Sequence, residues 1–289
     1  EASLNGAIVG MAQNYMGSNN INLLSPNGQF GTRLQGGSDS ASERYIHTNL
    51  CKITRLIYPE ADDAVLKYLD DDGTPVEPVH YAPIIPMVLV NGMVGIGTGF
   101  STNIPLYDPY KVINNIMKKL DSKDAKYSLL TPHYNNFKGT IVKIDKMNYI
   151  TKGLYKLNKH ENKLEITELP IGKWTDDYIK FIQENIQKDE KHNFITDYEN
   201  HSTDSEIHII CKVTDEFIFD FEHSTPDENG TNYVEKHMKL TSNKSLTNLH
   251  LYNKDNQIQK FKDVYEIMDH HYYVRYDLYI KRKEYMLNI

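Results

Sequence analysis

Residues 36–46 read GGSDSASERYI and place Tyr45 directly after Arg44. A phenol is a weak nucleophile until it loses its proton near about pH 10, so a phenol used for attack needs positive charge close by. A guanidinium supplies that charge and pairs bidentately with phosphoryl oxygens. The pair therefore suggests attack on a phosphate diester. The plainer interpretation is that Tyr45, one of 21 tyrosines, only packs at the start of a helix.

The segment around this pair has the apolar spacing of a helix. Ser40 followed three residues later by Glu43 fits a capping box, which would start that helix near Ala41. Tyr45 would then lie in the first turn, where free backbone N–H groups and the helix dipole favour an anion such as phosphotyrosine. The apolar residues at helical spacing are Ile46, Leu50, Ile53 and Ile57.

The flanking elements indicate an α+β chain. A helix over 4–15 with Gly17 as its C-cap, a strand at 21–24, a glycine-rich loop at 28–37 and the Tyr45 helix fit a winged-helix module. The acidic, Asn-rich stretch 215–245 carries no clear element. The remaining predicted elements are helices at 64–69, 112–120, 178–186 and 264–289, and strands at 83–92, 140–144, 153–157, 163–169 and 206–213.

Composition bounds the function. The chain has 289 residues, enough for more than one core, and a formal net charge of -7, which argues against a simple cationic nucleic-acid coat. The acids are clustered, however, so parts of the surface remain basic. Two distant cysteines form no metal or redox spacing, and no apolar run is long enough to cross a membrane. The chain begins without Met and stops inside a helical run, which suggests a piece of a longer polypeptide.

A second motif, 95–99, reads GIGTG. It could cradle a phosphate, but no helix opens after it, which argues against a dinucleotide fingerprint. An isoleucine between two glycines could instead project from a backbone that approaches DNA closely, and Ile96 would then act as an apolar wedge between base steps. The plainer interpretation is a tight turn with a buried isoleucine.

Together these motifs resemble eukaryotic-type type IIA DNA topoisomerases, including those of large DNA viruses. The resemblance covers almost the whole chain and is weakest from 189 to 245. Two departures are Glu43, where the family usually has Pro or Ala, and the pair Met93 and Val94, which replaces a small and an acidic residue. The shared landmarks are AQN at 12–14, GSNN at 17–20, GQFGTR at 28–33, VEP at 76–78, PIIPM at 83–87, ELP at 168–170, and YYVR at 272–275 with KRK at 281–283.

The resemblance implies an ATP-dependent topoisomerase II that cleaves both DNA strands through 5′-phosphotyrosyl links, passes another duplex and reseals. Tyr45 would be the nucleophile, Arg44 would stabilise phosphoryl charge, and Ile96 would bend the DNA. Further DNA contacts would come from Ser3, Gln13, Asn14, Arg33 and Trp174. The competing interpretation is a non-enzymatic DNA-bending module in which Tyr45 is purely structural.

The resemblance also implies three domains: a winged-helix domain over 1–80, a mixed α/β tower domain over 81–255, and the start of a coiled coil over 256–289. The partners would be double-stranded DNA and a second copy of the chain, with no membrane. Mg²⁺ and ATP would bind modules absent from this chain, so the fragment alone should not cleave DNA. The Asn, Lys, Ile and Tyr bias suggests an AT-rich genome. The site of action would be the nucleus of a cell, or the host cytoplasm or virion for a large DNA virus.

Overall fold

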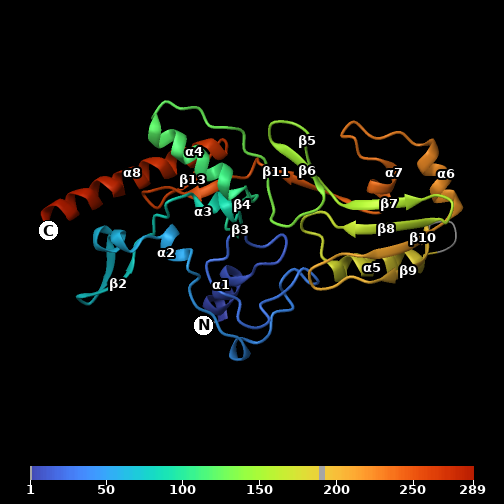
Figure 1. The fold of residues 1–289 in the computed structure, drawn as a ribbon, viewed down its shortest axis with the longest axis horizontal. Coiled ribbons are helices and arrows are strands. Elements are labelled where there is room, and N and C mark those ends of the chain that lie inside the picture. Colours follow the sequence, from blue (N-terminus) through green and yellow to red (C-terminus); the bar gives the residue numbers. More distant parts are fainter. Residues whose placement is uncertain (1, 189–192) are drawn as a thin grey trace. The chain divides into compact units, whose positions relative to one another are not determined.

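The computed structural model describes residues 2–188 and 193–289, a mixed α+β chain that divides into two compact units (Figure 1). The first unit combines residues 2–18 with Pro26–His47 and Tyr134–Ser245. The second combines Asn19–Ser25, Thr48–His133 and Leu246–Ile289. Each unit therefore assembles segments that are far apart in the sequence. The predicted boundaries at residues 80 and 255 stay a prediction.

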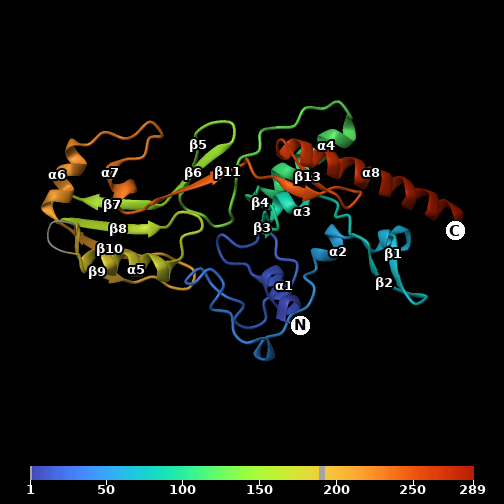
Figure 2. The ribbon, with the colours of Figure 1, turned by 180° about the vertical axis from the view of Figure 1, so that it is seen from behind.

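The first unit is built on a four-stranded antiparallel sheet in the order β7-β8-β10-β9. Its inner face carries alternate side chains such as Leu164 and Ile166 of β8, both fully buried against α5, α6 and α7. In Figures 1 and 2 the helix α5 runs beside β9. The elements of this core are β7 (Leu154–Asn158), β8 (Lys163–Glu168), α5 (Thr175–Ile186), β9 (Ile195–Asn200), β10 (Ile209–Val213), α6 (Asp215–His223) and α7 (Tyr233–His237).

The rest of the first unit is a three-stranded antiparallel sheet in the order β11-β6-β5, together with the amino-terminal helix and the loop that carries Tyr45. The predictions for 140–144, 153–157, 163–169, 178–186 and 206–213 are confirmed as element type, whereas β6 was not predicted. The bounds are α1 (Ala2–Ala12), the 3-10 turn η1 (Glu43–Tyr45), β5 (Thr140–Lys143), β6 (Asn148–Lys152) and β11 (Thr241–Ser245).

The second unit packs short hairpins and helices around a separate apolar core. Leu89 of α3, Ile104 of β4 and Met268 of α8 are among its buried residues. The helices α4 and α8 lie side by side in both ribbon views (Figures 1 and 2). The bounds are α2 (Thr54–Ile57), η2 (Glu60–Val65), β1 (Tyr68–Asp71), β2 (Thr74–Pro78), α3 (Met87–Val90), β3 (Met93–Gly97), β4 (Phe100–Ile104), α4 (Pro109–Asp121), β12 (His250–Tyr252), β13 (Ile258–Lys260) and α8 (Val264–Asn288).

The predicted helix from Ala41 through Ile57 is wrong. Only the three-residue turn η1 and the four-residue α2 form, and Ser42, which precedes η1, makes no side-chain capping bond. Between them the chain is extended, because His47 pairs with Asn27 in an antiparallel bridge. The dipole argument for Tyr45 therefore fails, since a three-residue 3-10 turn has almost no aligned peptide dipole.

Other predicted bounds also change. The opening helix ends at Ala12 rather than reaching Gly17, and the strand at 83–92 is replaced by α3. A short apolar run between prolines and a glycine fits either element by periodicity, and Pro86 directly before the first turn costs no helical hydrogen bond. The helix at 64–69 gives way to η2 and β1, and the strand at 21–24 to a single bridge at Leu24. The helices at 112–120 and 264–289 are confirmed.

Candidate functional site

Tyr45 ends the turn η1 and is 71% exposed, so its phenol is open to a large ligand. The Arg44 guanidinium carbon lies 5.3 Å from the centroid of the Tyr45 ring. Arg44 is exposed, and no carboxylate of residues 2–188 or 193–289 forms an ion pair with it. The neighbouring Glu43 is exposed as well. An accessible phenol therefore has a cation beside it that no described carboxylate neutralises.

The next residue, Ile46, explains why Tyr45 points outward. Ile46 is buried, and a Cβ added at Gly28 would lie 2.8 Å from its Cγ2 atom. Gly28 has φ +121°, a conformation that only glycine adopts at low cost. The His47 backbone N–H donates to the Asn27 carbonyl (3.0 Å), which holds the segment extended. The tight contact at Gly28 thus fixes Ile46 inward and leaves Tyr45 outside.

The glycine-rich loop before Tyr45 is closed by Asp39. The backbone N–H and the hydroxyl of Thr32 both donate to the Asp39 carboxylate, at 2.8 and 2.5 Å. Gln13 donates from Nε2 to the Phe30 carbonyl (2.9 Å) and more weakly to the Gly37 carbonyl (3.4 Å). Gln13, a predicted DNA contact, therefore anchors the loop. No sequence pattern indicated the Asp39 contact, because threonine and aspartate have many roles in loops.

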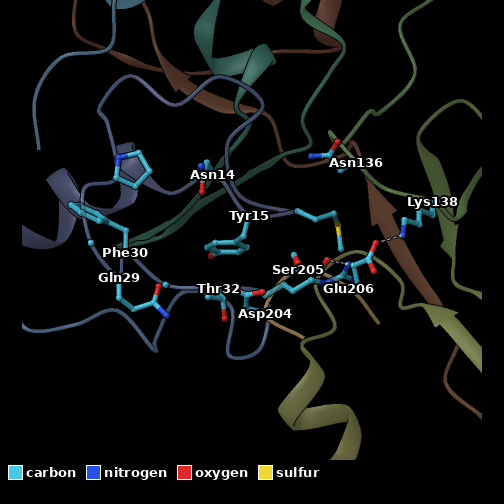
Figure 3. A pocket seen from close by; sticks show the side chains of 15 residues that line it. Asn14, Tyr15, Gln29, Phe30, Thr32, Asn136, Lys138, Asp204, Ser205 and Glu206 are labelled. Atoms are coloured by element: carbon cyan, nitrogen blue, oxygen red, sulfur yellow. Dashed lines mark hydrogen bonds and ion pairs between the residues drawn. The ribbon is translucent and has the colours of Figure 1, made fainter. Parts of the chain in front are cut away.

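A cavity of about 630 Å³ opens beside this loop (Figure 3). Asn14 and Tyr15 line it, and Lys138 and Glu206 form an ion pair at its edge with Nζ 3.0 Å from Oε1. Burial, and then the nearby charge of Asp39, raise the pKa of Tyr15. That phenol is therefore held neutral, unlike a phenol prepared for attack.

Arg33 is placed differently from its predicted role. It is 4% exposed, its Nη2 donates to Glu168, and its Nη1 makes a long contact of 3.4 Å with the Ser205 carbonyl. Glu168 is fully buried and also accepts from the Leu169 backbone N–H at 2.9 Å. This guanidinium joins the loop to strand β8 and is not presented to a phosphate.

Trp174, the single tryptophan, precedes α5 and packs against the glycine-rich loop. A Cβ added at Gly36 would lie 2.3 Å from its Cε2 and Nε1 atoms, and one at Gly17 would lie 3.3 Å from its ring. The Tyr15 ring meets the indole edge-on, with 5.8 Å between centroids. Trp174 thus supports the loop from one side.

Ile96 lies in the second unit, on the hairpin of β3 and β4, where it pairs with Ser101. It is 93% exposed, so the plainer interpretation of a buried isoleucine in a tight turn is wrong. Asn248 holds the base of the hairpin, because its carbonyl accepts from the Asn103 backbone N–H (2.9 Å). An apolar side chain is thereby presented to solvent on an anchored hairpin.

Ser3 on α1 and Asn14, the other two predicted DNA contacts, are both exposed. Among residues 2–188 and 193–289, no group of three His, Cys, Asp or Glu side chains is arranged to hold a metal ion. Of the described helices, none combines the length and apolarity needed to cross a bilayer.

Known proteins resemble the chain along its whole length. A family model that describes the A subunit of DNA gyrase/topoisomerase IV matches residues 1–289. A mitochondrial DNA topoisomerase 2 of Dictyostelium discoideum is 44% identical over 99% of this chain and 21% of its own length. A DNA topoisomerase 2 of Arabidopsis thaliana is 42% identical over 98% of this chain and 19% of its own length.

A solved structure agrees. The DNA-binding, cleavage and re-ligation domain of Plasmodium falciparum topoisomerase II superposes with a TM-score of 0.90 at 40% identity, over 99% of this chain and 37% of that one. The chain spans about a fifth of the length of the Dictyostelium and Arabidopsis relatives. The predicted resemblance to eukaryotic-type enzymes is confirmed. The chain belongs to the family that the A subunit of DNA gyrase/topoisomerase IV defines.

Proposed function

We propose that this chain is the DNA breakage-reunion region of an ATP-dependent DNA topoisomerase II. The protein would cleave both strands of one duplex, pass another through the break and reseal it, and so relax and decatenate DNA. The observation that carries the proposal is the exposed Tyr45 phenol beside the Arg44 guanidinium, which no described carboxylate pairs with. Relatives named DNA topoisomerase 2, at about 40% identity, support it.

The proposed step is a transesterification. The Tyr45 phenol oxygen attacks a DNA phosphorus and loses its proton, while the bond from phosphorus to the 3′ oxygen breaks and that oxygen takes up a proton. The products are a 5′-phosphotyrosyl link and a 3′-hydroxyl, so the reverse reaction reseals the strand without ATP. Arg44 stabilises the charge that develops on the phosphoryl oxygens.

DNA binding is proposed to use the exposed groups. Ile96 enters a base step and bends the duplex, which would favour deformable DNA. Ser3 and Asn14 are exposed and are proposed as DNA contacts. Gln13, Arg33 and Trp174 are engaged within the first unit, and we assign them to holding the loop of Tyr45.

The architecture proposed for the chain follows the resemblance: a winged-helix domain, a tower domain and the start of a coiled coil. The 25-residue helix α8, whose last turn includes the exposed Met286 and Leu287, is consistent with the third part. Two copies of the protein related by a twofold axis would cut opposite strands. The cellular site stays a prediction, either the nucleus or, for a large DNA virus, the host cytoplasm or virion.

Mg²⁺ and ATP are proposed to bind parts of the protein outside this chain. The described residues offer no cluster of acidic or imidazole ligands that fits a metal ion, so the chain's own contribution is the phenol, the guanidinium and the bending hairpin. When present, the metal would supply further charge stabilisation at the phosphate.

The test is covalent trapping with the protein at its natural length. A denaturant added during turnover should leave DNA joined to the wild-type protein and to Tyr110→Phe, which removes the hydroxyl of a tyrosine that is 78% exposed. Tyr45→Phe should give no adduct. An adduct that persists in Tyr45→Phe would refute the assignment. DNA bending without any adduct in the wild type would favour the alternative, a non-enzymatic bending module.

A further inference from the structure

The hairpin that carries Ile96 presents a second exposed apolar side chain. Val94 is 79% exposed and lies two residues before Ile96 on strand β3. Side chains two apart on a strand share one face, about 7 Å apart, so Val94 and Ile96 point the same way. Between and beyond them stand Gly95 and Gly97, which have no side chains to keep a ligand away from the backbone.

The opposite strand completes this face. In the hairpin register Val94 faces Asn103 and Ile96 faces Ser101. Ser101 Oγ already accepts a hydrogen bond from Asn248 Nδ2 at 2.6 Å. The Asn103 side chain is exposed, and no side chain of residues 2–188 or 193–289 hydrogen-bonds to it. The face therefore carries one wedge, one apolar neighbour and an amide that no described side chain engages.

The face is also held rigidly. The Asn248 carbonyl accepts from the Asn103 backbone N–H at 2.9 Å, and His250 Nδ1 donates to the Ser101 carbonyl at 3.0 Å. The Phe100 and His250 rings meet edge-on on the other face, 5.8 Å apart. Because the backbone is anchored, Val94 has a fixed position relative to Ile96.

We propose that Val94 selects A·T base pairs beside the step that Ile96 opens, and that Asn103 hydrogen-bonds to the floor of the same groove. This inference rests on the proposed function, in which Ile96 is a DNA wedge. Wedges of this kind enter from the minor groove, where asparagine recurs as a hydrogen-bonding residue. There the guanine 2-amino group is the feature that separates G·C from A·T.

Valine discriminates because it has no acceptor. Both kinds of base pair carry minor-groove acceptors that the Asn103 amide can meet, but only G·C adds the guanine 2-amino donor, and the valine methyl groups would strip water from that donor and leave it unpaired. The spacing of about 7 Å corresponds to roughly two base-pair rises, so the preference should fall about two pairs from the opened step.

The experiment uses the natural-length protein and duplexes randomised around the cleavage position. Two pools are sequenced: DNA bound without metal, and DNA trapped covalently during turnover. The variant Val94→Thr keeps the β-branched shape and adds a hydroxyl that can accept from guanine. Its matched control is Met93→Thr, at a 46% exposed position on the opposite face of the same strand.

Wild type and Met93→Thr should favour A·T at the expected pair by about fivefold or more, as one discriminated base pair typically contributes. In Val94→Thr the preference for A·T over G·C at that pair should fall to about twofold or less. Asn103→Ala should weaken binding of all sequences. An unchanged preference in Val94→Thr, in both pools, would overturn the inference even if adducts still depend on Tyr45. If the bound pool shows a preference that depends on Val94 while no DNA is trapped covalently, the inference about Val94 would stand and the proposed cleavage would be refuted.

Discussion

At the scale of single residues, Gly36 is a position where a side chain is poorly tolerated. Its φ is +62°, and an added Cβ would lie 2.3 Å from the indole of Trp174. Gly36→Ala should therefore lower the free energy of unfolding by about 2 to 4 kcal/mol, from backbone strain plus overpacking. Urea denaturation, followed by the fluorescence of the single tryptophan, measures this loss.

The matched control for Gly36 is Gly230 in the same unit. Gly230 has φ +70° but no atom within 4 Å of an added Cβ. Gly230→Ala should lower the free energy of unfolding only by the cost of backbone strain, about 1 to 2 kcal/mol, and should leave tryptophan emission unchanged. Equal losses of unfolding free energy in Gly36→Ala and Gly230→Ala would show that the Trp174 indole does not clash with a side chain at position 36.

Residue chemistry explains what the sequence could predict at this scale. Tyr45, Arg44 and Ile96 are exposed, as their proposed roles of nucleophile, phosphate ligand and wedge require. Arg33 was predicted as a DNA contact from the family resemblance, yet it pairs with Glu168, 135 residues away in the chain. No local pattern encodes such a pairing, so a buried cation and an exposed one look alike in sequence.

At the scale of elements, one carboxylate ties η2 to α8. Asp62 is 4% exposed and accepts from Arg275 Nη1 at 2.5 Å and Arg282 Nη1 at 3.0 Å. The Tyr279 ring lies 4.1 Å from one guanidinium carbon and 5.0 Å from the other. Asp62→Ala leaves a buried cation without its partner and should cost about 3 to 5 kcal/mol, measured by urea denaturation.

The adjacent acid is the control for Asp62. Asp63 pairs with Arg55 at 2.7 Å, but both side chains are about two-fifths exposed. Water and salt screen such a pair, so Asp63→Ala should change the free energy of unfolding by less than about 1 kcal/mol. Similar losses for Asp62→Ala and Asp63→Ala would mean that burial of the Asp62 pair contributes nothing.

Elements were predictable where one face stays buried along the whole segment. The helix α4 has Asp108 as its N-cap, Pro109 in its first turn and buried Val112 and Ile116, so spacing alone located it. From Ile46 to Ile57 the spacing looked equally helical, but Leu50 is 55% exposed. Pairing of that segment with residues before the glycine-rich loop outweighed the local pattern, and pairing partners are not visible in periodicity.

At the scale of the whole molecule, each compact unit gathers three separate segments. Sequence periodicity cannot show that Pro26–His47 and Tyr134–Ser245 belong together, because the contacts join residues more than a hundred positions apart. The family resemblance carried the fold class instead, and the match to a solved domain at a TM-score of 0.90 confirms a mixed α+β chain. The family was therefore predictable from motifs whose spatial relation was not.

The 289-residue chain, prepared alone, should bind DNA weakly and fail to cut it. Under the proposed function its phenol and guanidinium are present, but the metal that would share the phosphate charge binds elsewhere, and each such contribution is worth several kcal/mol of barrier. With supercoiled plasmid and Mg²⁺, neither nicked circles nor covalent adducts should accumulate. Tyr45→Phe of the same length is the control, and circular dichroism must first show both proteins folded. Nicking by the wild-type chain that disappears in Tyr45→Phe would mean that these residues complete the reaction without another module.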